Sequence, residues 1–149
     1  MAVIDIARTD VVTASPETSV ADVVRRLHRE SVSGLVVVED DRPLDLVTDR
    51  DLTRALLDDT LDAETTPVEE FVDGETPTVT ADAGIYETIE TFSERGVRRA
   101  IVVEDGTLAG LLSVSDVVVL LGMELQHVAN AIRSSSPAYE REGPAYYRG

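Results

Sequence analysis

Apolar residues along this chain fall into short blocks of two kinds, separated by polar or turn-forming residues. Some blocks are continuous runs rich in valine, which is typical of a strand buried on both faces. Others place apolar residues three and four positions apart, which predicts a helix with one buried face. In the first half these patterns predict an extended piece at 11–13, a helix at 20–31, strands at 35–38 and 44–48, and a helix at 49–57.

The same order of blocks recurs at an offset of 65 residues, which relates Val37 to Val102 and Asp51 to Asp116. Repeats of this size cannot cover their own apolar face, so two copies are expected to pack together. We therefore predict an α/β (α+β) fold of two β-α-β-β-α repeats about a pseudo-twofold axis. In the second half the predicted elements are an extended piece at 77–80, a helix at 84–95, strands at 100–103 and 108–112, and a helix from near 113.

The last helix is predicted to be longer than its counterpart, because an apolar stripe from Leu121 to Ile132 continues beyond the repeat. The apolar faces of the predicted helices at 49–57 and 113–133 exceed what one small core can cover, so we expect a homodimer. From Ser134 onward the sequence has no periodicity and predicts a flexible tail. The expected boundaries are repeat one at 1–60, a linker at 61–67, repeat two at 68–122, and the helical extension with its tail at 123–149.

Composition narrows the class of protein. The chain has 149 residues, of which 43% are hydrophobic and none is cysteine, so disulfides, thiol catalysis and cysteine-based zinc sites are excluded. A net charge of −16 repels nucleic acid and anionic membranes. The N-terminal residues lack the apolar core of a signal peptide, and the longest apolar run, at 117–121, is too short to span a bilayer. We therefore expect a cytoplasmic protein.

The acidic residues are spread along the chain, and all 13 basic residues are arginine. This distribution resembles adaptation to a high-salt cytoplasm, where screening weakens the repulsion between carboxylates. We predict a halophilic protein whose thermal unfolding midpoint rises when dilute buffer is replaced by molar salt. A midpoint that is equal or higher in dilute buffer would contradict that origin.

A hydroxyl and a carboxylate follow the last strand of each repeat. Ser113 and Asp116 stand three residues apart in repeat two, and Thr48 and Asp51 take the same positions in repeat one. This is the spacing of a capping box at a helix start, where backbone N–H groups can also donate to a ligand. The residues are therefore either helix caps alone or a place that binds the hydroxyls of a ribose.

The tandem repeat, the strand pattern V-x-x-h-V-V-V-[ED] and the strand-end pattern G-h-h-[ST]-x-x-D together resemble the cystathionine-β-synthase (CBS) domain pair, or Bateman module. The resemblance covers about residues 3 to 120. It implies a regulatory module that binds an adenosyl compound such as AMP, ADP, ATP or S-adenosylmethionine between the repeats and signals to a partner protein by conformational change. It implies no enzyme activity, no catalytic residue and no catalytic cofactor.

The resemblance also implies the ligand contacts. Asp116 matches the carboxylate that accepts hydrogen bonds from ribose hydroxyls, and Arg98 and Arg99 match basic residues that bind phosphate. The alternative for the two arginines is a solvated ion pair with Glu94 or Glu104. The main site is expected to comprise Asp116, Ser113, Ser115, Arg98, Arg99, Gly110, Thr78, Val32 and Ser33. A weaker second site would comprise Asp51, Thr48, Gly34, Thr13 and Val97.

Repeat one departs from the pattern at Asp45, where repeat two has Gly110. A glycine would let a ligand approach the backbone closely, whereas an aspartate adds bulk and negative charge. Repeat one also has Ser33 and Gly34 in place of the arginine pair. We therefore expect one competent site around Asp116 and one weak or vacant site around Asp51.

Two other function classes are open at this point. In a purely structural module the aspartates would only cap helices, and the apolar stripe would mediate assembly. An enzyme would need a nucleophile, base or metal cluster, but the only histidines, His28 and His127, lie on predicted helices and are interpreted as surface residues. The acidic pairs at 40–41 and 58–59 are interpreted as solvated turns, so no metal site is expected.

Overall fold

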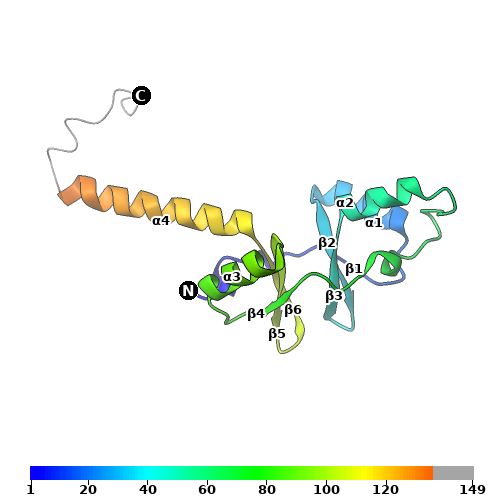
Figure 1. Ribbon diagram of the computed structural model, residues 1–149, viewed down its shortest axis with the longest axis horizontal. Helices are drawn as coiled ribbons and strands as arrows, with labels where there is room; N and C mark the ends of the chain where they lie inside the picture. Colours follow the sequence, from blue (N-terminus) through cyan, green and yellow to red (C-terminus); the bar gives the residue numbers. More distant parts are fainter. Residues whose placement is uncertain (136–149) are drawn as a thin grey trace, which may run out of the picture. The chain divides into compact units, whose positions relative to one another are not determined.

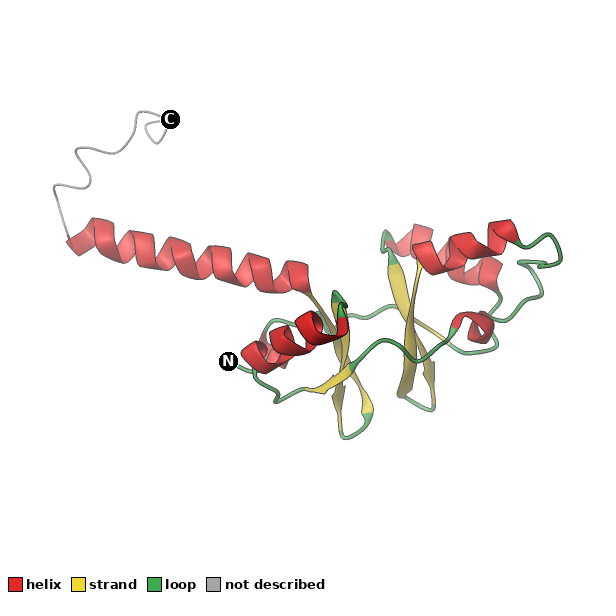
Figure 2. Ribbon diagram, in the orientation of Figure 1, coloured by secondary structure: helices red, strands yellow, loops and turns green. Residues whose placement is uncertain are grey.

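The structure is a computed structural model in which residues 1–135 are described. It confirms a mixed α+β fold with two three-stranded sheets (Figures 1 and 2). The described residues divide into two units, the first at Met1–Val114 and the second beginning at Ser115. Both sheets belong to the first unit. The predicted tail lies outside the described residues except for Ser134 and Ser135, which belong to the last helix.

The first sheet has the order β1-β2-β3, with β1 parallel to β2 and β2 antiparallel to β3. The helix α1 connects β1 to β2, and it begins where the Ser19 side chain accepts a hydrogen bond from the Asp22 N–H. A five-residue helix, α2, follows β3. The bounds are β1 Thr13–Ala14, α1 Val20–Glu30, β2 Gly34–Glu39, β3 Arg42–Thr48 and α2 Asp49–Thr53.

The second sheet repeats this arrangement in the order β4-β5-β6. Its register is the same, because Thr78 pairs with Ile101 as Thr13 pairs with Val36. The helix α3 ends at Gly96, which adopts a left-handed φ of 64° and confirms the predicted stop. The bounds are β4 Thr78–Thr80, α3 Ile85–Arg95, β5 Arg99–Glu104 and β6 Thr107–Ser113.

The predicted helix at 49–57 is α-helical only in its first five residues, and Arg54–Leu57 form a 3-10 turn. Leu56 and Leu57 are 83% and 87% exposed. A second α-helical turn therefore has no buried apolar face to stabilise it, and a short helix without such packing is marginal.

The segment ahead of each sheet packs into the core of the other repeat. In a 3-10 turn at Val3–Asp5, Val3 is fully buried in the core of repeat two, and its N–H donates to the Ala83 carbonyl (2.9 Å). A 3-10 turn at Val68–Phe71 places Val68 in the core of repeat one in the same way. The two repeats thus exchange their leading segments, an arrangement with pseudo-twofold symmetry.

The two sheets also share an apolar interface. Val36, Leu46 and Ile101 are buried there, and β3 contacts both β5 and β6. A backbone hydrogen bond from the Leu108 N–H to the Asp41 carbonyl (3.0 Å) joins the two hairpins. Figure 1 shows the sheets side by side. The repeats therefore form one folded body through both this interface and the exchanged segments.

The last helix, α4, runs without a break over Val114–Ser135 and confirms the predicted extension. Gly122 and Asn130, both poor helix formers, do not interrupt it. In the part of the chain that the structure describes, no helix combines the length and apolar character needed to cross a bilayer.

Candidate functional site

The hydroxyl and carboxylate at the start of α2 form a capping box. The Thr48 N–H and Oγ1 both donate to Asp51 Oδ2 at 2.9 Å, and the Asp51 N–H donates to Thr48 Oγ1 at 3.2 Å. Thr48 and Asp51 therefore cap α2 in repeat one. These bonds use only one carboxylate oxygen, and an ionised carboxylate has about four acceptor positions. Capping is thus compatible with a second role for the partly exposed Asp51 in accepting ligand hydroxyls.

Arg99 extends from the start of β5 to the start of β2 in the other repeat. Its Nη2 donates to Ser33 Oγ at 3.0 Å, and a methyl group at Gly34 would lie 3.4 Å from Nη1. Gly34 pairs with Thr48 in the sheet register, and the Asp49 N–H donates to the Ser33 carbonyl (2.8 Å). These contacts connect a set of five residues that we call the Arg99 cluster: Ser33, Gly34, Thr48, Asp51 and Arg99.

The two adjacent arginines have different surroundings. Arg98 is exposed, and its carbonyl accepts a hydrogen bond from the Val114 N–H (2.9 Å). Across residues 1–135, neither arginine has a carboxylate oxygen within 4.0 Å, so the ion pairs with Glu94 or Glu104 are not formed. Only Arg99 joins the two repeats, and it does so on the side of Asp51.

Asp45 has a structural role. It is 1% exposed, and its carboxylate accepts hydrogen bonds from the backbone N–H groups of Asp73 (3.0 Å), Gly74 (2.9 Å) and Thr76 (3.4 Å). Burial by itself would raise the pKa of Asp45, but these hydrogen bonds stabilise the carboxylate, and the pKa is lowered. The interpretation of Asp45 as bulk and charge facing a ligand is therefore wrong, because the side chain anchors the segment ahead of β4.

Gly110 receives the N-terminal segment. A methyl group at this position would lie 2.9 Å from the Arg8 carbonyl oxygen and 3.3 Å from the Ala7 Cβ. Arg8 and Leu111 also exchange two backbone hydrogen bonds, of 3.0 and 2.9 Å. The structure thus gives a packing reason for the glycine, and a ligand contact there stays a prediction. Asp45 and Gly110 occupy equivalent positions of the two repeats, and each contacts the segment ahead of the other repeat's sheet. Asp45 does so through hydrogen bonds, and Gly110 through close packing.

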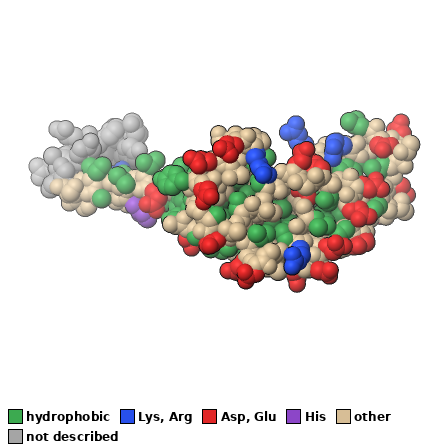
Figure 3. Space-filling model, turned by 60° about the horizontal axis from the view of Figure 1, so that its bottom comes forward, with side chains coloured by type: hydrophobic (Ala, Val, Ile, Leu, Met, Phe, Trp, Pro, Cys, Tyr) green, Lys and Arg blue, Asp and Glu red, His purple; other side chains and the backbone are tan. Residues whose placement is uncertain are grey.

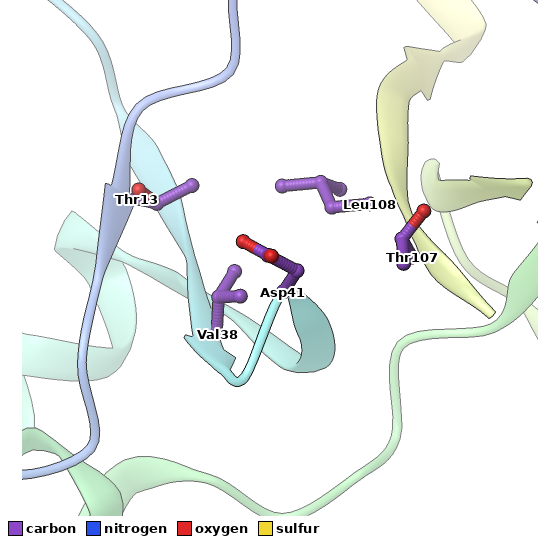
Figure 4. Close-up of a pocket in the computed structure, with 5 residues that line it drawn as sticks. All are labelled: Thr13, Val38, Asp41, Thr107 and Leu108. Carbon is purple, nitrogen blue, oxygen red and sulfur yellow. The ribbon is translucent and has the colours of Figure 1, made fainter.

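Two hollows of the first unit contain one predicted contact each. The smaller has a volume of about 310 Å³ and lies between the two hairpins, where Thr13, Asp41 and Leu108 point toward the same space (Figure 4). The Thr13 carbonyl is also bonded by the Arg26 guanidinium. The larger, of about 500 Å³, is lined by Thr78 together with residues of the segment ahead of β4 and of α3. The Arg99 cluster lines neither of these hollows.

The remaining predicted contacts are in three places. Val32 and Val97 are partly buried and pack against the cores of repeats one and two, respectively. Ser113 ends β6 in the first unit, whereas Ser115 and Asp116 lie in the first turn of α4 in the second unit. Their contacts with a ligand stay predictions.

The family of the two repeats follows from comparison with known proteins. The CBS domain model matches residues 3–58 and again residues 64–122. The chain belongs to the CBS domain family. This CBS pair is 25% identical over 116 residues to an uncharacterized protein of Methanopyrus kandleri, a match covering 76% of this chain and 59% of that protein. The chain thus spans less than two thirds of that relative.

Two solved structures share the fold of this CBS pair. A CBS domain protein from Pyrobaculum aerophilum complexed with AMP is 22% identical, with a TM-score of 0.69 over 78% of this chain and 89% of that chain. A CBS domain pair in complex with 5′-methylthioadenosine and S-adenosyl-L-methionine is 20% identical, with a TM-score of 0.71 over 83% of this chain and 98% of that chain.

Proposed function

We propose that this CBS pair is a regulatory module that binds an adenosyl ligand, such as AMP, ADP, ATP or S-adenosylmethionine, and signals binding to a partner protein. The observation that carries the proposal is the contact of Arg99 with Ser33, beside the hydroxyl and carboxylate of the α2 start. The adenosyl ligands of the two similar CBS structures support the ligand class. No catalytic residue or catalytic cofactor takes part in this function.

The Arg99 cluster offers complementary groups to the two ends of a nucleotide. The Asp51 carboxylate accepts hydrogen bonds from a ribose diol, and the guanidinium of Arg99 matches phosphate oxygens in a bidentate geometry. A carboxylate repels phosphate, so the two groups fix the direction of the ligand. Acidic side chains are spread over the face shown in Figure 3. In a chain of net charge −16 a bound phosphate needs a nearby cation to offset the repulsion, and the guanidinium of Arg99 supplies one.

A second ribose position is proposed at Asp116 from the sequence motif, with Ser113 and Ser115 within three residues of it, and the family resemblance adds Arg98 as a phosphate contact. The sequence favours Asp116 as the main site, whereas the contact of Arg99 with Ser33 favours a phosphate-bearing ligand at Asp51. Arg99 corresponds to Gly34 at the repeat offset, so repeat one has no side chain that could make the reciprocal contact.

Isothermal titration with AMP, ATP, S-adenosylmethionine and adenosine tests these proposals. Asp51→Ala and Asp116→Ala are compared separately. The variant that removes the ribose-binding aspartate should weaken AMP binding about tenfold or more, because a charge-assisted hydrogen bond is lost. Arg99→Gln should weaken AMP and ATP but leave adenosine unchanged. Asp82→Ala is the matched control, since Asp82 is exposed and carries the same charge.

The alternative is a purely structural CBS pair, in which Thr48 and Asp51 serve only as the capping box that the structure shows. The same titration distinguishes the two functions. If none of the four compounds binds, the result favours the structural alternative and contradicts the proposed ligand class. If binding occurs but neither aspartate variant changes it, the module binds adenosyl ligands elsewhere, and both ribose positions are wrong. Two equal sites in the wild type would contradict the expected asymmetry.

A further inference from the structure

Five of the exposed apolar residues of α4 follow a heptad repeat, while Val114, Val119 and Met123 are exposed outside it. Val118, Leu121, Leu125, Val128 and Ile132 are separated by three, four, three and four residues. The mean spacing of 3.5 is the period of a left-handed coiled coil, in which these residues occupy the a and d positions. Their exposed fractions lie between 47% and 69%, so the stripe is open to a partner. We call these five residues the α4 stripe.

The positions beside the α4 stripe are mostly small. The e positions are Gly122 and Ala129, and the g positions are Glu124 and Ala131. Long side chains at e and g hold helices apart or select partners by charge, whereas glycine and alanine let two backbones approach closely. The flanks of the stripe therefore favour direct helix-to-helix packing.

The charge of this segment differs from that of the rest of the chain. Residues 117–135 contain one acidic residue, Glu124, and one basic residue, Arg133, in a chain with 29 acidic residues in 149. Depletion of charged residues distinguishes the centre of protein interfaces from other surface. It also removes most of the local repulsion that would oppose the approach of two chains of net charge −16.

We propose that α4 pairs with the α4 helix of a second copy of this chain through the α4 stripe. A heptad face is self-complementary, because the same a and d residues of two identical helices can interlock around a twofold axis. The stripe spans residues 118–132, about 22 Å of helix at the usual rise per residue. A coiled coil this short is marginal alone, so dimerisation should depend on protein concentration and strengthen with salt.

Light scattering of the full chain in molar salt, combined with substitutions at two exposed positions of α4, tests this proposal. Leu125 lies in the middle of the stripe, whereas Met123 lies at an f position outside it, and they are 69% and 57% exposed. We expect the wild type and Met123→Glu to be dimers. Leu125→Glu should be a monomer with unchanged helix content. Its two carboxylates would be buried in an apolar layer of the dimer, which should raise the dimer dissociation constant about 100-fold or more.

Cysteine cross-linking gives an independent readout, because the natural chain contains no cysteine. Leu125→Cys should form a disulfide-linked dimer on oxidation in either orientation of the two helices, and Met123→Cys should not. A monomeric wild type would overturn the proposal, and so would equal cross-linking of the two cysteine variants. A dimer that survives Leu125→Glu and dissociates in Leu56→Glu would show that the copies meet at the 3-10 turn after α2 instead.

Discussion

Replacing Asp45 with alanine is expected to lower the free energy of unfolding by about 3 kcal/mol or more, since each buried donor that loses its acceptor costs about 1 to 3 kcal/mol. The side chain is 1% exposed and accepts backbone N–H groups from Leu46, Asp73 and Gly74 at 2.8 to 3.0 Å. Removing it leaves these donors unpaired and releases the segment ahead of β4. Urea unfolding at neutral pH and fixed salt measures the loss.

Two further variants separate the lost charge from a general effect of substitution. Asp82→Ala, at an exposed position, should change the free energy of unfolding by less than about 0.5 kcal/mol. Asp45→Asn keeps the shape of the side chain but turns an NH₂ group toward N–H donors, so it should also destabilise the protein. A small, equal effect of all three substitutions would show that the Asp45 carboxylate does not anchor the segment.

The pH dependence of the difference between wild type and Asp45→Asn has a definite sign. Because the pKa of Asp45 is lowered in the folded state, its carboxylate contributes its full stabilisation above the unfolded pKa of about 4. This contribution is lost as the pH falls through the folded pKa. The stability difference should therefore be constant near neutral pH and shrink only below about pH 4.

The elements that the sequence predicted well are those specified by local chemistry. The helix predicted at 20–31 is α1 at Val20–Glu30, because Ser19 caps it and its apolar residues recur at helical spacing. Gly96 ends α3 because it can adopt a positive φ. The 3-10 turn at Arg54–Leu57 was not predicted, since the difference depends on whether Leu56 and Leu57 are covered, which is a tertiary property.

The candidate site was predictable only in part, for a similar reason. The hydroxyl and carboxylate at Thr48 and Asp51 are three residues apart, so a local pattern identifies them. The partners of Asp45 begin 28 residues away, and Arg99 lies 66 residues from Ser33, so no local pattern shows these contacts. The sequence did contain one signal for the Arg99 contact. The repeat offset relates Arg99 to Gly34, and because glycine has no side chain, the long arginine side chain has room to reach the equivalent position of the other repeat.

The exchange of leading segments also had no local signal. Val3 and Val68 are identical at the repeat offset, which shows that they are equivalent but not which core each one enters. The structure places each in the core of the opposite repeat. The first eight residues, which carry little periodicity, are therefore part of the folded body of repeat two.

Val3→Asp is expected to destabilise repeat two more than repeat one. Val3 is fully buried beside Ala81 and Phe92, and an unpaired carboxylate there should cost roughly 3 kcal/mol or more. Hydrogen exchange of the native protein reports stability element by element. We expect amides of α3 and β4 to lose protection first, although residue 3 precedes the first sheet in the chain.

Val68→Asp provides the mirror experiment, because Val68 is fully buried in the core of repeat one. It should reduce protection first in α1 and β1, although residue 68 directly precedes the second sheet. Met1→Asp, at a position that is 69% exposed, should change neither pattern. If each valine variant instead loosened the sheet that follows it in sequence, the leading segments would not be exchanged. Both variants bury one charge, but in different repeats. Opposite patterns of amide protection would therefore report which core each leading segment enters, whereas a general loss of stability would give the same pattern for both variants.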